Sequence, residues 1–470
     1  MRSRYCHYLL LAAQIFSSAA ALSIPALPLP VLPIPASSIP ALSIHVQRSN
    51  SSAVPPSQDP FYAVPSDLGN KSPGAILNHR QSPSPVVAFG INPDNIQDSH
   101  QVLYRTTDGN GQATATVMTL LIPKNANLGA VLSFQLAENA IIIDCAPSYG
   151  ITAAGYADKL LSSPTAQLQV LLIQAALADG WVVAVPDFQG PKAAFVDQKM
   201  AGQAILDALR ATLQSGSFTG VRQDALTALW GYSAGASVTK VAAEFQPKYA
   251  KELNLAGVAF GGTGSAGLGI IKEINNGPHA GLIPPSLIGL ALESPEFKLM
   301  MDLNLKKEFK DKFYSPLHQC LDANLKTFEN ADVLGMFVCW DFCVFPALNV
   351  ALLKYVQGSG VSKAPVYWYQ DVHDEIAPIK DVDAAVQKYC DSGANVHYQR
   401  DDAANVNHKN YGIIGAPNAL GWLRDIMHGK KPDPQCVTET VTISDLPDSF
   451  LNIFPPVIRN GLVQLLHQTS

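Results

Sequence analysis

The chain has 470 residues, enough for one large domain with an insertion, and 47% of them are hydrophobic while only 15% are charged. A formal net charge of −6 argues against nucleic acid or an anionic membrane surface as a partner. The sequence has no zinc-type spacing of Cys and His and no phosphate-binding glycine loop followed by Lys-Ser/Thr, so we expect no metal and no cofactor.

The N-terminus has the pattern of a secretory signal peptide. Arg2 and Arg4 precede a short apolar run at 8–16, and small residues at 17–21 suit cleavage. The apolar run is shorter than the roughly 18–20 residues that cross a bilayer. We therefore predict a signal peptide over 1–21, a secreted extracellular protein and no transmembrane anchor.

Residues 22–58 form a Pro- and Ser-rich stretch in which Ile-Pro-Ala-Leu occurs twice, at 24–27 and 39–42. Proline at this density prevents helix formation and favours extended chain, so we expect a disordered stalk or pro-segment. Sequons at Asn50 and Asn70 are candidate glycosylation sites.

The folded domain is predicted to begin near residue 59. Strand-like runs then follow one another at 101–105, 113–122, 130–135, 181–185, 225–230, 255–260, 366–369 and 396–398. The first runs have no helix between them and indicate antiparallel pairing. The later ones alternate with helix-compatible segments, such as 167–179 and 201–215, and indicate βαβ units in a parallel sheet.

Between 261 and 364 this alternation stops, and the composition favours a mainly helical insertion over the sheet. We expect the α/β core to comprise 59–260 and 365–436. Residues 437–470 form a C-terminal extension whose apolar patches, 450–457 and 462–466, suit packing on the insertion or at a substrate mouth.

The run around Ser233 has the pattern G-x-S-x-G, from Gly231 to Gly235, with an apolar strand before it and a helix-compatible segment after it. This context predicts a nucleophile elbow, a strand-turn-helix corner that exposes the serine hydroxyl. The two glycines leave room for the strand and the helix to approach. The alternative is an ordinary turn whose serine caps the helix.

A serine hydroxyl needs a base to take its proton, and the base needs an acid to orient it. In chains with a nucleophile elbow these residues follow one another in the sequence order Ser, Asp/Glu, His. The turn after the strand at 366–369 carries three candidate acids, Asp371, Asp374 and Glu375. Spacing alone does not choose among them. His373 lies in the same turn, and we interpret it as a solvated turn residue.

His408 is the predicted base, because it lies in the loop that follows the strand at 396–398 and precedes an amphipathic helix at 417–427. His397 lies within the strand and His428 at the helix end, so both are interpreted as structural. The oxyanion of an ester-cleavage intermediate needs backbone donors. Ala234, directly after the serine, and Asn139, after the strand at 130–135, are the candidates; Asn139 also suits a simple turn.

These motifs together resemble the fungal secretory lipase family of the α/β-hydrolase superfamily. The resemblance spans residues 60–436 and rests on segments at 133–149, 187–195, 231–236, 260–263 and 374–378, and on His408. It implies an α/β-hydrolase fold, a mostly parallel sheet flanked by helices, with 261–364 as a helical lid. It also implies a triad of Ser233, Asp374 and His408, with Asp374 chosen over Asp371 by the element Asp-Glu-Ile-Ala-Pro.

The resemblance also bears on the oxyanion hole and the cysteines. A family member has Asp where this chain has Asn139, so the backbone amide is retained and the charge is lost. Six cysteines remain after the signal peptide, which indicates three disulfides among 15 pairings. The resemblance implies Cys145–Cys320 and Cys390–Cys436, which leaves Cys339 and Cys343 as a local pair.

The predicted function is a secreted serine lipase or esterase that hydrolyses carboxylic esters through an acyl-enzyme, acting as a monomer on an ester or lipid substrate, including one at a lipid–water interface. The first alternative is a secreted deacetylase of a small secondary metabolite, similar to trichothecene deacetylases. The second is a non-catalytic binding protein on the same scaffold.

Overall fold

The structure is a computed structural model that describes residues 53–470 except 265–268, 356–359, 405, 444 and 468–470. The expected signal peptide, most of the stalk and the sequon at Asn50 lie outside the described residues. Asn70 is exposed, at the end of a short 3-10 helix.

A ten-stranded sheet organises the described chain, in the order β1-β2-β3-β5-β4-β6-β7-β8-β9-β10. β1, β2, β3 and β5 pair antiparallel, and every pair from β5 and β4 to β9 and β10 is parallel. The strands are β1 (Ile76–Gln81), β2 (Ile96–Thr107), β3 (Ala113–Pro123), β4 (Asn127–Gln135), β5 (Trp181–Pro186), β6 (Leu226–Tyr232), β7 (Leu255–Gly261), β8 (Val366–Asp371), β9 (Val396–Asp401) and β10 (Val437–Val441). The predicted α/β-hydrolase fold is thus confirmed.

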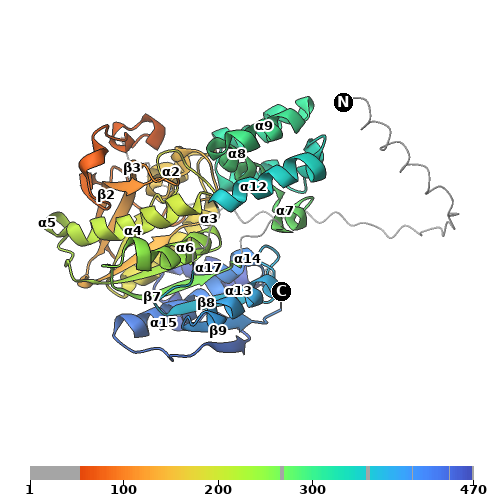
Figure 1. The fold of residues 1–470 in the computed structure, drawn as a ribbon. Coiled ribbons are helices and arrows are strands. Elements are labelled where there is room, and N and C mark those ends of the chain that lie inside the picture. The colour runs from red at the N-terminus through yellow and green to blue at the C-terminus, as the bar shows by residue number, and fades with distance from the viewer. Residues whose placement is uncertain (1–52, 265–268, 356–359, 405, 444, 468–470) are drawn as a thin grey trace, which may run out of the picture. The chain divides into compact units, whose positions relative to one another are not determined.

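Helices cover both faces of this sheet because both sides of its central strands are apolar. Alternate side chains of β4, such as Leu132 and Val131, enter different cores. The first core packs under α3 (Pro164–Ala178), α14 (His408–Ile414) and α15 (Ala416–Met427), and the second under α4 (Gln198–Gln214), α6 (Ala234–Tyr249) and α13 (Ile379–Asp391) (Figure 1).

The segment between β7 and β8, here called the helical insertion, contains helices and no strand among its described residues. Its α-helices are α7 (Gly269–Ile274), α8 (Ile283–Glu293), α9 (Pro295–Asn304), α10 (Lys310–Phe313), α11 (Leu321–Thr327) and α12 (Phe345–Tyr355). They enclose a separate core that includes Phe297, Met301 and Phe328. In Figure 1, α8, α9 and α12 lie together to one side of the sheet.

The C-terminal residues differ from the expectation. β10 pairs with β9, so the sheet continues past residue 436. Phe450, Phe454 and Leu462 are buried in the first core, near α16 (Asp448–Leu451) and α17 (Pro456–His467), and none of this segment joins the core of the helical insertion. The apolar patches of 437–470 therefore pack on the α/β core rather than on the insertion.

Three disulfides occur within the part of the chain that the structure describes. They are Cys145–Cys320, Cys390–Cys436 and Cys339–Cys343, with Cα–Cα distances of 5.6, 5.8 and 5.4 Å. The first ties the helical insertion to the segment that follows β4, beside the short helices α1 (Pro147–Gly150) and α2 (Ala153–Ala157). The remaining α-helix of the α/β core, α5 (Gly216–Thr219), is short. No helix among the described residues has the length and hydropathy of a membrane span.

Candidate active site

Ser233 lies at a sharp corner between β6 and α6. Its backbone has φ 58° and ψ −124°, a strained conformation for a residue with a side chain. A Cβ on Gly231 would come within 2.5 Å of the Gly235 carbonyl oxygen, and one on Gly235 within 1.9 Å of the Gln135 carbonyl oxygen. The two glycines therefore allow β6, α6 and β4 to meet, and Ser233 is left at the tip.

His408 bridges the serine and the carboxylate that follow two different strands. Its Nε2 lies 2.7 Å from Ser233 Oγ, and its Nδ1 lies 2.9 and 2.8 Å from the two carboxylate oxygens of Asp374. The imidazole can therefore accept the serine proton while its Nδ1–H donates to the carboxylate. His408 is the first residue of α14, not a loop residue as the sequence suggested.

The turn after β8 holds Asp374 in one orientation. Oδ1 accepts the backbone N–H groups of Ile376 and Ala377, at 2.8 and 2.7 Å, and Oδ2 accepts from Gln370 Nε2 at 2.8 Å. These three hydrogen bonds fix the orientation of the carboxylate beside His408.

The two other candidate acids do not contact the imidazole. Asp371 Oδ1 accepts the backbone N–H of His373, and burial raises the pKa of Asp371 to about 6. Glu375 instead accepts the backbone N–H of His408 at 2.9 Å. Geometry therefore favours Asp374 as the partner of the ring.

The surroundings of His408 favour its charged form. Burial by itself lowers the pKa of the imidazole, but the charge and hydrogen bond of Asp374, with the charges of Glu375 and Asp371, raise it overall. This is the property required of a base that holds a proton during ester cleavage. The three histidines that the sequence interpretation set aside have other surroundings: His373 is exposed, His397 contacts Glu439, and His428 contacts the carbonyl of Arg424.

Ala234 and Asn139, the two predicted amide donors, line a cavity together with Ser233. Ala234 begins α6, where the first N–H groups of a helix have no intrahelical acceptor. Asn139 follows β4 with φ 46°, a left-handed conformation that Asn tolerates better than most residues. Asn139 and Ser233 line the same two cavities.

Ser233 lines both cavities. One, of about 90 Å³, is mostly apolar, and leucines and isoleucines of α3, α11 and α14 contribute to its lining, among them Leu168, Leu325 and Ile413. The other, of about 220 Å³, passes Ala234 and Thr263 toward Ile270 of the helical insertion. Helices of the insertion therefore form part of both walls. No group of three metal-binding side chains occurs within the residues that the structure describes.

The sequence did not predict the roles of three residues around His408, one of which, Glu375, was considered only as a candidate acid. Tyr232 donates its hydroxyl to the His408 carbonyl at 2.6 Å, and Glu375 accepts from the His408 N–H. Tyr232 and Glu375 are adjacent in sequence to predicted triad residues, and this adjacency could have indicated that they lie near His408. His279, which contacts Glu375 at 3.1 Å, comes from the helical insertion, and nothing in the sequence connected it with the site.

Comparison with known proteins places this arrangement in context. The family model described as "Secretory lipase" matches residues 157–434. The chain is 38% identical to Lipase A of Arthroderma benhamiae over 89% of each chain, and 35% identical to Lipase 2 of Candida albicans over 84% of this chain and 85% of the other.

Among solved structures, the X-ray structure of Candida antarctica lipase A has a TM-score of 0.74 at 26% identity, and covers 88% of this chain and 96% of that one. The rice cell wall degrading esterase LipA of Xanthomonas oryzae, at 14% identity and a TM-score of 0.56, shares the fold.

Proposed function

Since the chain belongs to the secretory lipase family, whose members here are ester hydrolases of the lipase type, we propose that it is a secreted serine hydrolase of carboxylic esters with Ser233, His408 and Asp374 as its triad. The observation that carries the proposal is the continuous chain from Ser233 Oγ through His408 to Asp374, at 2.7 and 2.8 Å. Secretion fits the predicted signal peptide and the name of the family.

The reaction proceeds in two acyl transfers. Ser233 Oγ attacks the ester carbonyl carbon while its proton moves to His408 Nε2, and Asp374 stabilises the imidazolium. The C–O bond to the alcohol then breaks, and His408 returns the proton to the leaving oxygen. A water molecule, deprotonated by His408, cleaves the acyl-enzyme, which releases the acid and restores Ser233.

The negative charge of each tetrahedral intermediate lies near the carbonyl oxygen, where Ala234 N–H and Asn139 N–H are the proposed donors. Fixed backbone donors need no reorganisation during the reaction. The Ala137 N–H, two residues before Asn139, donates to Gln169 Oε1 at 3.0 Å and holds this loop against α3.

The apolar cavity favours a substrate with a hydrocarbon acyl chain, since each buried methylene contributes roughly 0.8 kcal/mol. The helical insertion would act as the lid over this cavity. Its outer surface carries exposed large apolar side chains, most prominently Phe342, which is 90% exposed; others include Leu292, Leu299, Leu303, Val338 and Val350.

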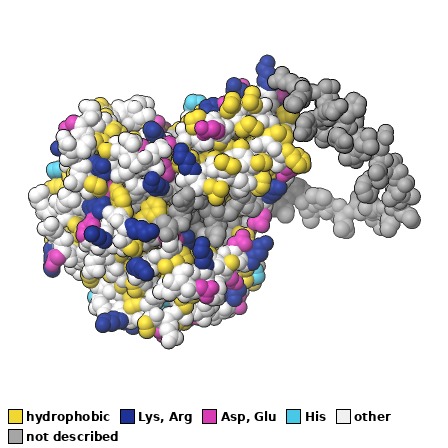
Figure 2. Space-filling model, viewed as in Figure 1, with side chains coloured by type: hydrophobic (Ala, Val, Ile, Leu, Met, Phe, Trp, Pro, Cys, Tyr) yellow, Lys and Arg dark blue, Asp and Glu magenta, His cyan; other side chains and the backbone are white. Residues whose placement is uncertain are grey.

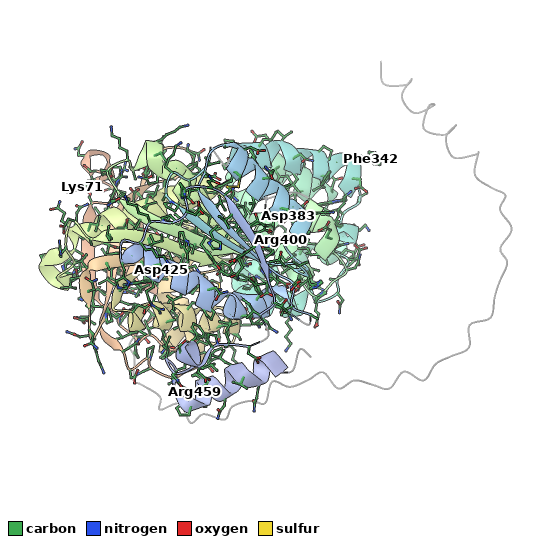
Figure 3. The ribbon with its side chains drawn as sticks, turned by 90° about the horizontal axis from the view of Figure 1, so that it is seen from below. Lys71, Phe342, Asp383, Arg400, Asp425 and Arg459 are labelled. Atoms are coloured by element: carbon green, nitrogen blue, oxygen red, sulfur yellow. A yellow bond between two sulfur atoms is a disulfide. The ribbon has the colours of Figure 1, made fainter. Side chains whose placement is uncertain are left out.

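This surface supports a lipid–water interface as the place of action. Figure 2 shows apolar side chains gathered over the helical insertion, and Figure 3 shows Phe342 at its outer edge. Large exposed apolar patches on a soluble protein usually mark a surface that binds a protein, a membrane or a ligand. A deacetylase of a small soluble metabolite would gain nothing from them.

Hydrolysis of p-nitrophenyl esters from acetate to palmitate by the wild type and by Ser233→Ala tests the proposal. We expect activity to rise from acetate toward longer chains, and Ser233→Ala to lose at least about 10⁴-fold in kcat. Ser392→Ala, at an exposed helix end, is the matched control and should retain full activity.

Activity confined to acetate would favour the deacetylase alternative, and an unchanged biological activity in Ser233→Ala would favour the binding protein. A Phe342→Ser variant tests the role of the exposed apolar surface of the helical insertion separately from the chemistry of the triad. It should keep wild-type activity on a soluble short-chain ester and lose activity on emulsified triacylglycerol.

A further inference from the structure

His408 is held by its backbone as well as by its ring. Its N–H donates to Glu375 Oε2 at 2.9 Å, and its carbonyl accepts the Tyr232 hydroxyl at 2.6 Å. Tyr232 directly precedes Ser233, and Glu375 directly follows Asp374. The residues next to the nucleophile and next to the acid therefore fix the backbone of the base between them.

The contact with Glu375 is well suited to this task. His408 is the first residue of α14, so its N–H has no acceptor within the helix, and Glu375 supplies one. A carboxylate at a helix N-terminus is also electrostatically favoured. Burial alone would raise the pKa of Glu375, but the hydrogen bonds from His279 and from the His408 backbone lower it to about 2, so Glu375 is ionised at every working pH.

The second oxygen of Glu375 connects this clamp to the helical insertion. His279 Nε2 lies 3.1 Å from Glu375 Oε1, and His279 belongs to the insertion, directly before the 3-10 helix Ala280–Leu282. His279 also lines the cavity beside Ser233. One carboxylate therefore contacts the base with one oxygen and the wall of the substrate cavity with the other.

We propose that Glu375 is a positioning residue for His408, and that His279 makes this positioning depend on the helical insertion being seated over the cavity. The proposal rests on the proposed function, since it assumes that His408 is the base for Ser233. When the insertion is seated, His279 restrains the Glu375 carboxylate, and the start of α14 is fixed. When it moves away, Glu375 loses one partner and the imidazole is less well placed.

Variants of Glu375 separate positioning from charge. In Glu375→Gln the amide oxygen can still accept from His408 N–H, while Glu375→Ala removes the acceptor. We expect Glu375→Ala to lower kcat by about 10- to 100-fold with KM nearly unchanged, because small displacements of a catalytic group are costly. Glu375→Gln should retain most of kcat on a soluble ester, counted per active site titrated with a phosphonate.

The pH profile supplies a readout that a purely structural residue would not move. The charged groups that act on His408 are Asp374, Glu375 and Asp371, and each raises the pKa of His408. Loss of the Glu375 charge lowers that pKa, so the acid limb of kcat/KM should move to lower pH in both variants. Only Glu375→Ala should also have a lower plateau, which is the pH-independent value of kcat/KM above the acid limb. An undiminished plateau in Glu375→Ala, or an equal loss in Glu375→Gln, would overturn the positioning role.

A double-mutant cycle tests the link to the insertion. His279→Ala should lower kcat by about 3- to 10-fold in the wild type and by less than about 2-fold when Glu375 is already alanine, because the two residues act through one contact. Additive effects would overturn the link.

The His397–Glu439 pair, at 2.7 Å between β9 and β10, is a matched exposed control whose variants His397→Ala and Glu439→Gln should leave kcat unchanged. A fully active Ser233→Ala would contradict the proposed function itself. Additive effects in the double-mutant cycle, with Ser233→Ala inactive, would contradict only the link between Glu375 and His279.

Discussion

Tyr232 shows how much of the site depends on contacts to the backbone. Its hydroxyl is buried and donates to the His408 carbonyl, and burial keeps its pKa well above the ordinary value, so it stays a neutral donor. Its ring also fills the space beside Gly412 and Gly262, where a Cβ would come within 2.9 and 2.6 Å of ring atoms. Tyr232 therefore places both α14 and the serine that follows it.

We expect Tyr232→Phe to leave the His408 carbonyl without its donor while preserving the packing of the ring. The free energy of unfolding should fall by about 1–3 kcal/mol, the cost of an unsatisfied buried acceptor. The kcat for ester hydrolysis should fall by about tenfold because the imidazole shifts. Urea unfolding and steady-state kinetics measure both. Tyr398→Phe, which removes a hydroxyl that donates to Asp383, is the control that should affect kcat little.

At the residue scale the sequence predicted the three side chains that the structure brings together. Ser233 and His408 followed from motif and chain order. The choice of Asp374 needed the family resemblance, because Asp371, Asp374 and Glu375 all follow the same strand and differ only in how the turn folds. His279 could not be predicted, since the helical insertion reaches the site through tertiary packing alone.

At the element scale, the strands with both sides buried were predicted and the edge strands were missed. Each expected run corresponds to one of the strands β2 to β9. β1 and β10 are largely polar or half-exposed, so neither has the apolar character of a buried strand. The helical insertion was recognised because the strand-helix alternation stops there, but its cavity-lining faces depend on how α7, α8, α11 and α12 pack.

The two disulfides of the helical insertion should contribute differently. Cys145–Cys320 closes a separation of 175 residues and Cys339–Cys343 one of 4. In the chain-entropy model, removing them costs about 5 and about 2 kcal/mol. We expect Cys145→Ser/Cys320→Ser to lower the free energy of unfolding more than Cys339→Ser/Cys343→Ser does, which urea unfolding measures.

The same variant should also raise KM, because α11 lines the cavity with Leu321 and Leu325. The Cys339→Ser/Cys343→Ser variant is the matched control and should leave KM for a soluble ester unchanged. Equal effects of the two pairs on KM would contradict a role for the long-range disulfide in seating α11.

At the scale of the whole molecule, buried carboxyl groups set the pH dependence of stability. Burial raises the pKa of Asp187 to about 7 and that of Asp197 to about 6, and raises that of Glu138 well above its usual range. In the unfolded chain these groups titrate near about 4. Between about pH 4 and 7 the folded protein therefore binds more protons, and its stability falls as the pH rises.

We expect the melting temperature to be highest near pH 4–5 and lower at pH 8. Below that range the ionised Glu375, whose pKa is lowered to about 2, loses its stabilising contribution as it becomes protonated. Calorimetry from pH 3 to 8 measures this dependence. Asp187→Asn should flatten it between pH 5 and 8. A melting temperature that rises steadily toward pH 8 would show that these carboxyl groups are not buried in their neutral form.

In the proposed mechanism, Ser233 forms the acyl-enzyme with His408 as its base. The most direct measurement is mass spectrometry of the protein after reaction with a long-chain p-nitrophenyl phosphonate. We expect one phosphonyl group per molecule, located on the peptide that contains Ser233, and none in Ser233→Ala. Labelling should also be strongly slowed in His408→Ala. A label on another residue, or no label in a fully active protein, would contradict the account.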